Sequence, residues 1–200
     1  MGRLAVIDGL DGCGKQTQTE LLATCLRQEG IPVKQITFPT YTRSSAPIEL
    51  YLSGELGALD EVNVYAASTF YAVDRYASFC RDWGSDYNAG RLVLTDRYVT
   101  ANVIHQMGKL PRERWEDYLE WLSDLEYTRF GLPRPDVVFY LELPLETADA
   151  LLAGRYAGQQ HKKDLHARAR VHCGDGAGGI RPAQDISREL RRLLGQTLGL

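Results

Sequence analysis

The chain has 200 residues, 44% of them hydrophobic, so it can bury a sizeable core within one compact domain. Its 23 basic and 26 acidic residues give a net charge of −3, which argues against a general nucleic-acid-binding surface. The four cysteines form no CxxC pair and no metal-ligand spacing, so reduced thiols in a cytoplasmic protein are expected. The apolar run after Arg3 is too short for a signal peptide, and no segment is long enough to span a membrane.

Short apolar runs alternate with longer segments of helical pattern, which is typical of an α/β protein with a parallel sheet. The expected strands are Leu4–Ile7, Val33–Phe38, Leu92–Thr95, Val137–Leu143 and a short fifth at Val171–Cys173. The expected helices are Thr17–Gln28, which Gly30 ends, Asn63–Trp83 and Arg112–Tyr127. Pro133 and Pro135 break the chain before the fourth strand. Because there is no repeat or long linker, residues 1–200 are predicted to form a single domain.

A glycine-rich loop, Gly9-Leu-Asp-Gly-Cys-Gly14-Lys15, connects the first strand to the first helix. Glycines let backbone N–H groups surround phosphate oxygens, and the helix N-terminus adds a positive dipole end. Lys15 is expected to face solvent and to contact the β- and γ-phosphates of a nucleotide. We therefore predict that ATP is bound by the loop and the start of the helix, at Gly9, Asp11, Gly12, Cys13, Gly14, Lys15, Gln16 and Thr17.

One position departs from the usual P-loop pattern, in which the lysine is followed by a serine or threonine that binds Mg²⁺. Here Gln16 follows Lys15, and Thr17 comes one place later and points in another direction on the helix. The amide oxygen of Gln16 is an alternative hard ligand with a different reach. Local positive charge could lower the pKa of the Cys13 thiol, but we interpret Cys13 as a small residue that the loop tolerates.

The third strand ends in Asp96-Arg97-Tyr98. Ligands gather at the carboxyl ends of strands in a parallel sheet. A carboxylate there can hold Mg²⁺, and an arginine can clamp a phosphate through two hydrogen bonds. A buried ion pair beside a packing tyrosine is an equally common interpretation of this tripeptide on its own.

With these motifs the chain resembles the thymidylate kinases, a family of P-loop nucleoside monophosphate kinases. Further matches are Phe38-Pro39 followed by Arg43, Phe70-Tyr71-Ala-Val-Asp74-Arg75, and Leu132-Pro-Arg-Pro-Asp136. The resemblance spans roughly residues 3–166. It implies a P-loop fold with about five parallel strands, flanking helices and a flexible lid. It also implies transfer of the γ-phosphate of ATP, with Mg²⁺, to thymidine monophosphate (dTMP).

The resemblance also implies roles for residues on the acceptor side. Asp11 would bind the 3′-hydroxyl of the acceptor sugar, and Arg43 and Arg97 would hold the acceptor phosphate. Tyr71 would stack on the base, leaving Phe70 for the core, and Arg75 would donate to a base carbonyl. The remaining acceptor-side residues that it implies are Phe38, Pro39 and Gln106, the last at the base edge. The alternative for this helix is an amphipathic core helix with Arg75 on the surface.

The chain departs from the family pattern after Asp-Arg-Tyr. Where relatives commonly have a serine and then a Tyr-Gln pair, this chain has Ala101 and His105-Gln106. Family members with glycine at the position of Gly12 supply positive charge from a basic lid, which implies a lid over about residues 153–170. A solvated charged loop is the alternative interpretation of this segment.

Within the lid, Arg155 would pack on adenine, and either Lys162 or Lys163 would contact the transferred phosphoryl group. The other basic residues of the segment are His166, Arg168 and Arg170. The family usually has a helix between the lid and the last strand, for which only Ala167–Arg170 remain here. Gly174–Gly179 resembles the loop beside adenine, and the last helix begins near Pro182.

These observations predict a direct in-line phosphoryl transfer in which Lys15, Arg97 and Asp96 are the catalytic residues. Asp96, with Gln16 as a second candidate, would hold Mg²⁺. The expected partners are ATP and dTMP, without nucleic acid or membrane, and the family implies a homodimer. Alternatives are a kinase for another deoxynucleoside monophosphate or for a deoxynucleoside, and a non-catalytic nucleotide-binding homologue.

Overall fold

The computed structural model describes residues 1–143, 169–172 and 181–199. Within these ranges five parallel strands form one sheet, in the order β2-β3-β1-β4-β5. The strands are β1 (Arg3–Gly9), β2 (Val33–Thr37), β3 (Leu92–Asp96), β4 (Val137–Glu142) and β5 (Ala169–His172). The predicted α/β fold with a parallel sheet is therefore confirmed, and each predicted strand overlaps an observed one.

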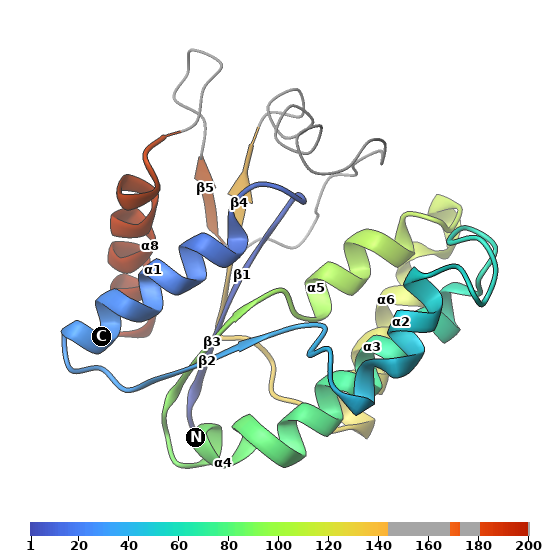
Figure 1. Cartoon of the computed structure of the whole chain (residues 1–200), viewed down its shortest axis with the longest axis horizontal. Coiled ribbons are helices and arrows are strands. Elements are labelled where there is room, and N and C mark those ends of the chain that lie inside the picture. The colour runs from blue at the N-terminus through green and yellow to red at the C-terminus, as the bar shows by residue number, and fades with distance from the viewer. Residues whose placement is uncertain (144–168, 173–180, 200) are drawn as a thin grey trace.

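Helices cover both faces of the sheet (Figure 1). One face carries α1 (Lys15–Gln28) and α8 (Ala183–Leu198), which pack against each other. The other face carries α2 (Ala46–Leu52), α3 (Val64–Ser78), α4 (Gly84–Asn88), α5 (Val99–Asn102) and α6 (Trp115–Ser123). Shorter helical segments join them, namely η1 (Arg43–Ser45), η2 (Phe79–Trp83), η3 (Val103–Met107), η4 (Arg112–Arg114) and η5 (Asp124–Arg129).

Strand β1 shows why the strands are such continuous apolar runs. Leu4 and Val6 belong to the core cluster under α3, whereas Ala5 and Ile7 belong to the cluster under α1 and α8. All four side chains are fully buried. Since alternate residues of a strand face opposite sides, a strand covered by helices on both sides is apolar at every position.

The long helix predicted over residues 63–83 is interrupted by a π-helical segment. Asn63 caps α3 by accepting hydrogen bonds from the N–H groups of Tyr65 and Ala66. After Ser78 the chain widens into η2, where the N–H of Gly84 donates to Phe79 O, and then continues as α4. A Cβ on Gly84 would lie 2.4 Å from Phe79 O, so this widened turn requires glycine.

The sheet register brings three functional segments to one end of the molecule. Ile7 of β1 and Thr37 of β2 both lie beside Asp96 of β3. The glycine-rich loop, Asp96-Arg97 and the segment after β2 therefore meet at the carboxyl end of the sheet. No helix in the described part of the chain is both long and apolar enough to cross a membrane.

Candidate active site

The glycine-rich loop depends on backbone conformations that favour glycine. Gly12 and Gly14 have φ values of 83° and 88°, and Gly14 leads directly into α1. Gly9 has a φ of 149°, and a Cβ there would lie 2.7 Å from Leu141 O and 2.8 Å from Cys13 Sγ. The loop is thus packed tightly against the end of β4, where no side chain larger than that of glycine fits at position 9.

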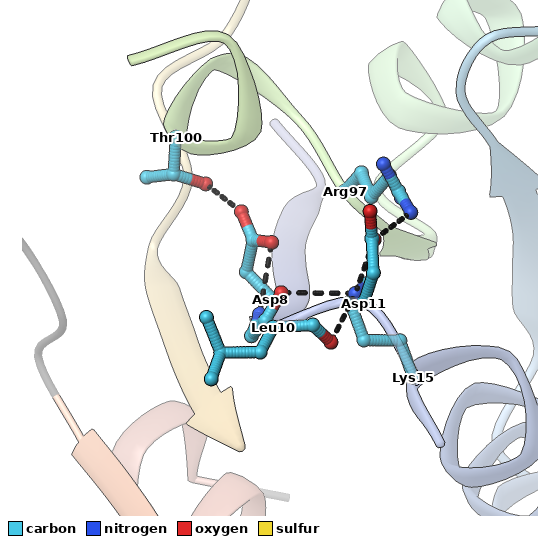
Figure 2. Close-up of polar contacts among 7 residues, drawn as sticks. Asp8, Leu10, Asp11, Lys15, Arg97 and Thr100 are labelled. Carbon is cyan, nitrogen blue, oxygen red and sulfur yellow. Dashed lines mark hydrogen bonds and ion pairs between the residues drawn. The ribbon is translucent and has the colours of Figure 1, made fainter. Parts of the chain in front are cut away.

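Lys15 is buried rather than facing solvent, contrary to the expectation from the sequence. Its Nζ donates to the carbonyl oxygens of Gly9 at 2.9 Å and Leu10 at 2.8 Å, and lies 3.4 Å from Asp11 Oδ1 (Figure 2). A buried ammonium group needs such acceptors, and the carbonyls of its own loop are the nearest. The ammonium group of Lys15 therefore lies within the glycine-rich loop, where a phosphate is expected to bind.

Asp11 joins the glycine-rich loop to the end of β3. Its Oδ1 accepts from Nη2 of Arg97, and both side chains are about one-third exposed (Figure 2). Burial alone would raise the pKa of Asp11, but the positive charges of Arg97, Lys15 and His105 outweigh it and lower the pKa. Asp11 is thus an ionised group between the two halves of the site.

Asp8 is a functional candidate that the sequence interpretation missed. Its carboxylate is buried, accepts from the N–H of Gly9 at 2.9 Å and accepts from Thr100 Oγ1 at 2.5 Å (Figure 2). It connects the first residue of the loop to α5 on the acceptor side. An acidic residue at the end of an otherwise apolar strand was the signal that could have identified it.

Asp96 lies at the end of β3, and burial raises its pKa although a hydrogen bond from Thr37 opposes the shift. The side chain of Gln16 is exposed and donates to Glu20 Oε1 at 3.0 Å, and Thr17 is exposed on the same helix. In the described residues there is no group of three or more His, Cys, Asp or Glu side chains that could hold a metal.

Burial raises the pKa of the Cys13 thiol more than the charge of Lys15 lowers it, so the possibility of a lowered pKa for Cys13 is wrong.

The segment after β2 is shaped by a buried carboxylate on α3. Asp74 accepts from Thr40 N at 2.8 Å and from Ser44 Oγ at 2.6 Å. Between these residues Arg43 is exposed and lines a cavity of about 590 Å³ together with Arg81 and Asp82. Arg97 is not among the residues that line this cavity. Arg43 and Arg97 therefore do not share this pocket.

Phe38 and Pro39 begin this segment. Phe38 is buried and its ring lies 6.0 Å from that of Tyr98, whereas Pro39 is half-buried. On α3, Tyr71 is half-buried and meets the ring of Tyr51 edge to face. Phe70 is also half-buried and belongs to neither core cluster, contrary to the expectation above.

Arg75 is fully buried in an ion pair, so the alternative that places it on the surface is wrong. Its Nε and Nη2 donate to the two oxygens of Glu126 in η5, a side chain with no exposed surface. The guanidinium also lies 5.9 Å from the centre of the Tyr98 ring. Glu126 fixes the orientation of Arg75 by this two-point contact, and its role was not predicted.

Asn102 of α5 is a further residue that the sequence interpretation missed. Its side chain is buried, and Nδ2 donates to Ser68 O at 3.1 Å. Its Oδ1 is a buried acceptor with no hydrogen-bond partner among the described residues. Such an atom is costly to bury, so it calls for a hydrogen-bond donor that the described residues do not supply.

The two neighbouring polar residues of η3 differ in burial. Gln106 is buried and its Nε2 donates to the hydroxyl of Tyr51 at 3.1 Å. The His105 side chain is exposed to solvent. The protein around it still reduces the solvation of the imidazole, which lowers the pKa of His105. The lid residues Arg155, Lys162, Lys163, His166 and Arg168 lie outside the described residues, as does the loop 174–179.

A strand, a glycine-rich loop and a helix carrying a lysine, with an Asp-Arg pair at the end of the adjacent strand, define a P-loop nucleotide-binding protein. The family model described as thymidylate kinase matches residues 7–174. The chain therefore belongs to the thymidylate kinase family.

Individual relatives agree with this assignment. The thymidylate kinase of Mycobacterium tuberculosis is 32% identical over 160 residues, which cover 76% of this chain and 71% of that protein. A probable thymidylate kinase of Thermococcus gammatolerans is 31% identical over 175 residues, covering 86% and 80%. The structure of thymidylate kinase from Candida albicans has the same fold, with a TM-score of 0.69 at 20% identity over 98% of this chain and 92% of that one.

Proposed function

We propose that this chain transfers the γ-phosphate of ATP to dTMP to give dTDP. Family membership supports the reaction class, and the meeting of the two halves of the site at Asp11 supports a direct transfer. Lys15 lies on the loop side of Asp11 and Arg97 on the acceptor side. Phosphoryl transfer requires positioning and charge neutralisation rather than a covalent intermediate, and this pair of cations can supply both.

In this mechanism the side chains exchange protein partners for nucleotide partners. Lys15 would leave the carbonyls of Gly9 and Leu10 for the phosphates of ATP. Arg97, and Arg43 after a movement of its segment, would hold the acceptor phosphate. Asp11 could then accept a hydrogen bond from the 3′-hydroxyl of the sugar. From the lid, Arg155 would pack on adenine, and Lys162 or Lys163 would reach the transferred group.

The observation that carries the choice of acceptor is the unpartnered Oδ1 of Asn102. Its Nδ2 donates to Ser68 O, which fixes the orientation of the amide and leaves the oxygen as the atom that would accept from the base. Ser68, Tyr71 and Arg75 recur at helical spacing along one side of α3. A thymine base has an N–H donor beside a carbonyl acceptor, which would complement an acceptor from Asn102 and a donor from Arg75. Cytosine has the opposite pattern at those two positions.

Mg²⁺ fits the donors at the end of β3. This ion is usually held by one or two carboxylates together with phosphates and waters, and Asp96 is a hard oxygen donor beside the loop. Gln16 is a weaker candidate because its amide is paired with Glu20. When bound, Mg²⁺ would offset negative charge on the β- and γ-phosphates.

The test is ADP release from Mg·ATP with dTMP, dUMP, dCMP and thymidine as acceptors. We expect dTMP to be the best acceptor and thymidine, which lacks the phosphate, to be poor. Asn102→Leu should raise the acceptor KM about tenfold, since one hydrogen bond is lost, and leave the ATP KM unchanged. Nucleotide binding without acceptor-dependent ADP release would instead show a non-catalytic homologue, and a preference for dCMP would contradict the assigned base.

A further inference from the structure

A polar network beside the proposed base site joins Gln106, which is expected at the base edge, to three residues that the mechanism above does not use. We call it the Tyr51 network, and it consists of Tyr51 of α2, Leu59, Gln106 of η3 and Lys109. The Tyr51 hydroxyl accepts from Gln106 Nε2 at 3.1 Å and from Lys109 Nζ. Lys109 Nζ also donates to Leu59 O.

These contacts hold the ring of Tyr51 firmly. The side chain is only 3% exposed, and Lys109 Nζ stands 5.1 Å from the centre of its ring. The hydroxyl also donates to Leu59 O at 3.5 Å. Buried polar groups that are mutually satisfied in this way rigidify the elements that they join, here α2, the loop after it and η3.

The edge of this fixed ring meets Tyr71. The two ring centres are 6.4 Å apart and the planes are 89° to each other, which is the favourable edge-to-face arrangement. A partner that is held at its hydroxyl restricts the tilt of the ring that it touches. Tyr71 is the residue proposed to stack on the base, so the orientation of its plane affects how well the base is held.

We propose that Tyr51 is a positioning residue for the acceptor base, acting through Tyr71 and held in place by Gln106 and Lys109. The inference rests on the proposed function, because it requires a base on Tyr71. Preorganisation of this kind lowers the entropic cost of binding the acceptor and leaves the transfer step unchanged. It therefore predicts an effect on acceptor affinity without an effect on kcat or on ATP.

The test is Tyr51→Phe, which removes the hydroxyl and keeps the ring. We expect the acceptor KM for dTMP to rise about two- to tenfold, with kcat and the ATP KM within about twofold of the parent chain. The matched control is Tyr65→Phe, on α3, whose hydroxyl likewise accepts from a cation, Arg114, at 3.3 Å. Its ring packs against Tyr118 and Trp121 instead of Tyr71, so the dTMP KM should not change.

A second variant keeps the inference testable if Tyr51→Phe does not fold. Lys109→Met removes one of the two donors to the hydroxyl and should by itself raise the dTMP KM, with kcat and the ATP KM unchanged. Where both variants fold, their effects on the dTMP KM should be non-additive. An unchanged dTMP KM in both variants, or equal changes in the KM values of dTMP and ATP, would overturn the inference. If the parent chain shows no dTMP-dependent ADP release, the proposed function fails by itself, and calorimetric Kd values for dTMP then decide the role of Tyr51 by the same criteria.

Discussion

Arg97 has a backbone φ of 78°, in the left-handed region that residues other than glycine rarely adopt. Its N–H donates to Ile7 O, which fixes the backbone beside β1 while the side chain reaches Asp11. Arg97→Gly and Arg97→Ala remove the same guanidinium, so their difference in stability isolates the backbone strain. We expect the glycine variant to be more stable by about 1 kcal/mol in denaturant unfolding, with phosphoryl transfer lost in both. Equal stabilities would show that the conformation costs little here.

The proposed metal site can be tested at Asp96 and Gln16. Asp96→Asn keeps the shape and removes the charge that would face the cation, so we expect it to lose most activity. Gln16→Thr restores the usual P-loop hydroxyl and breaks only an exposed contact with Glu20, so activity should be kept or raised. Both variants are followed through a magnesium titration. Loss of turnover by Gln16→Thr at saturating magnesium would reveal a specific role for the amide.

The pKa of Asp11 is lowered in the folded protein, which gives its charge a defined effect on stability. A carboxyl whose folded pKa is depressed stabilises the protein above its ordinary value of 3.8, and this contribution is lost as the pH falls through the folded pKa. The free energies of unfolding of the parent chain and of Asp11→Asn should therefore differ at neutral pH and converge in acid. A difference that does not change with pH would mean that the ion pair with Arg97 has no net effect.

At the scale of elements, the Arg75–Glu126 pair joins α3 to η5 through two fully buried side chains. Removing one partner leaves an uncompensated buried charge, so Glu126→Gln should destabilise the fold by about 3–5 kcal/mol. The double variant Arg75→Met with Glu126→Leu should recover much of that loss while the acceptor KM stays high. Thermal or denaturant unfolding of the three chains measures this, and a double variant as unstable as the single one would show that the pair contributes more than charge compensation.

The elements also show how far the sequence alone leads. The strands could be predicted because residues buried on both faces are apolar at every position, as Leu4–Ile7 illustrates. Helix α5 could not, because it is short and its β-branched residues Val99 and Thr100 are weak helix formers. The partner of Arg75 could not be predicted either, since Glu126 is 51 positions away and only the packing of α3 against η5 joins them. The orphan acceptor of Asn102 is likewise visible only in three dimensions.

At the scale of the whole molecule, the proposed ATP site follows β1, the proposed acceptor site includes the end of β3, and the two meet at Asp11. A ligand at a hundredfold excess over its Kd stabilises the folded state by about 2.7 kcal/mol, which should raise the melting temperature by several degrees. We expect Mg·ATP and dTMP each to produce such a rise in the parent chain. In Lys15→Met the rise with Mg·ATP should be lost and the rise with dTMP kept. Loss of both would contradict the separate assignment of the two sites.

Strand β1 precedes β3 and β4 in the chain, yet it lies between them at the centre of the sheet. During synthesis the two neighbouring strands begin only at Leu92 and Val137. The apolar side chains of β1 therefore remain unpaired for on the order of ten seconds. Gly9, at the end of β1, packs on Leu141 of β4. The glycine-rich loop therefore reaches its final surroundings late in translation, although it is encoded near the start of the chain. A ribosome-bound chain that ends before β4 should be sensitive to protease and unable to retain nucleotide.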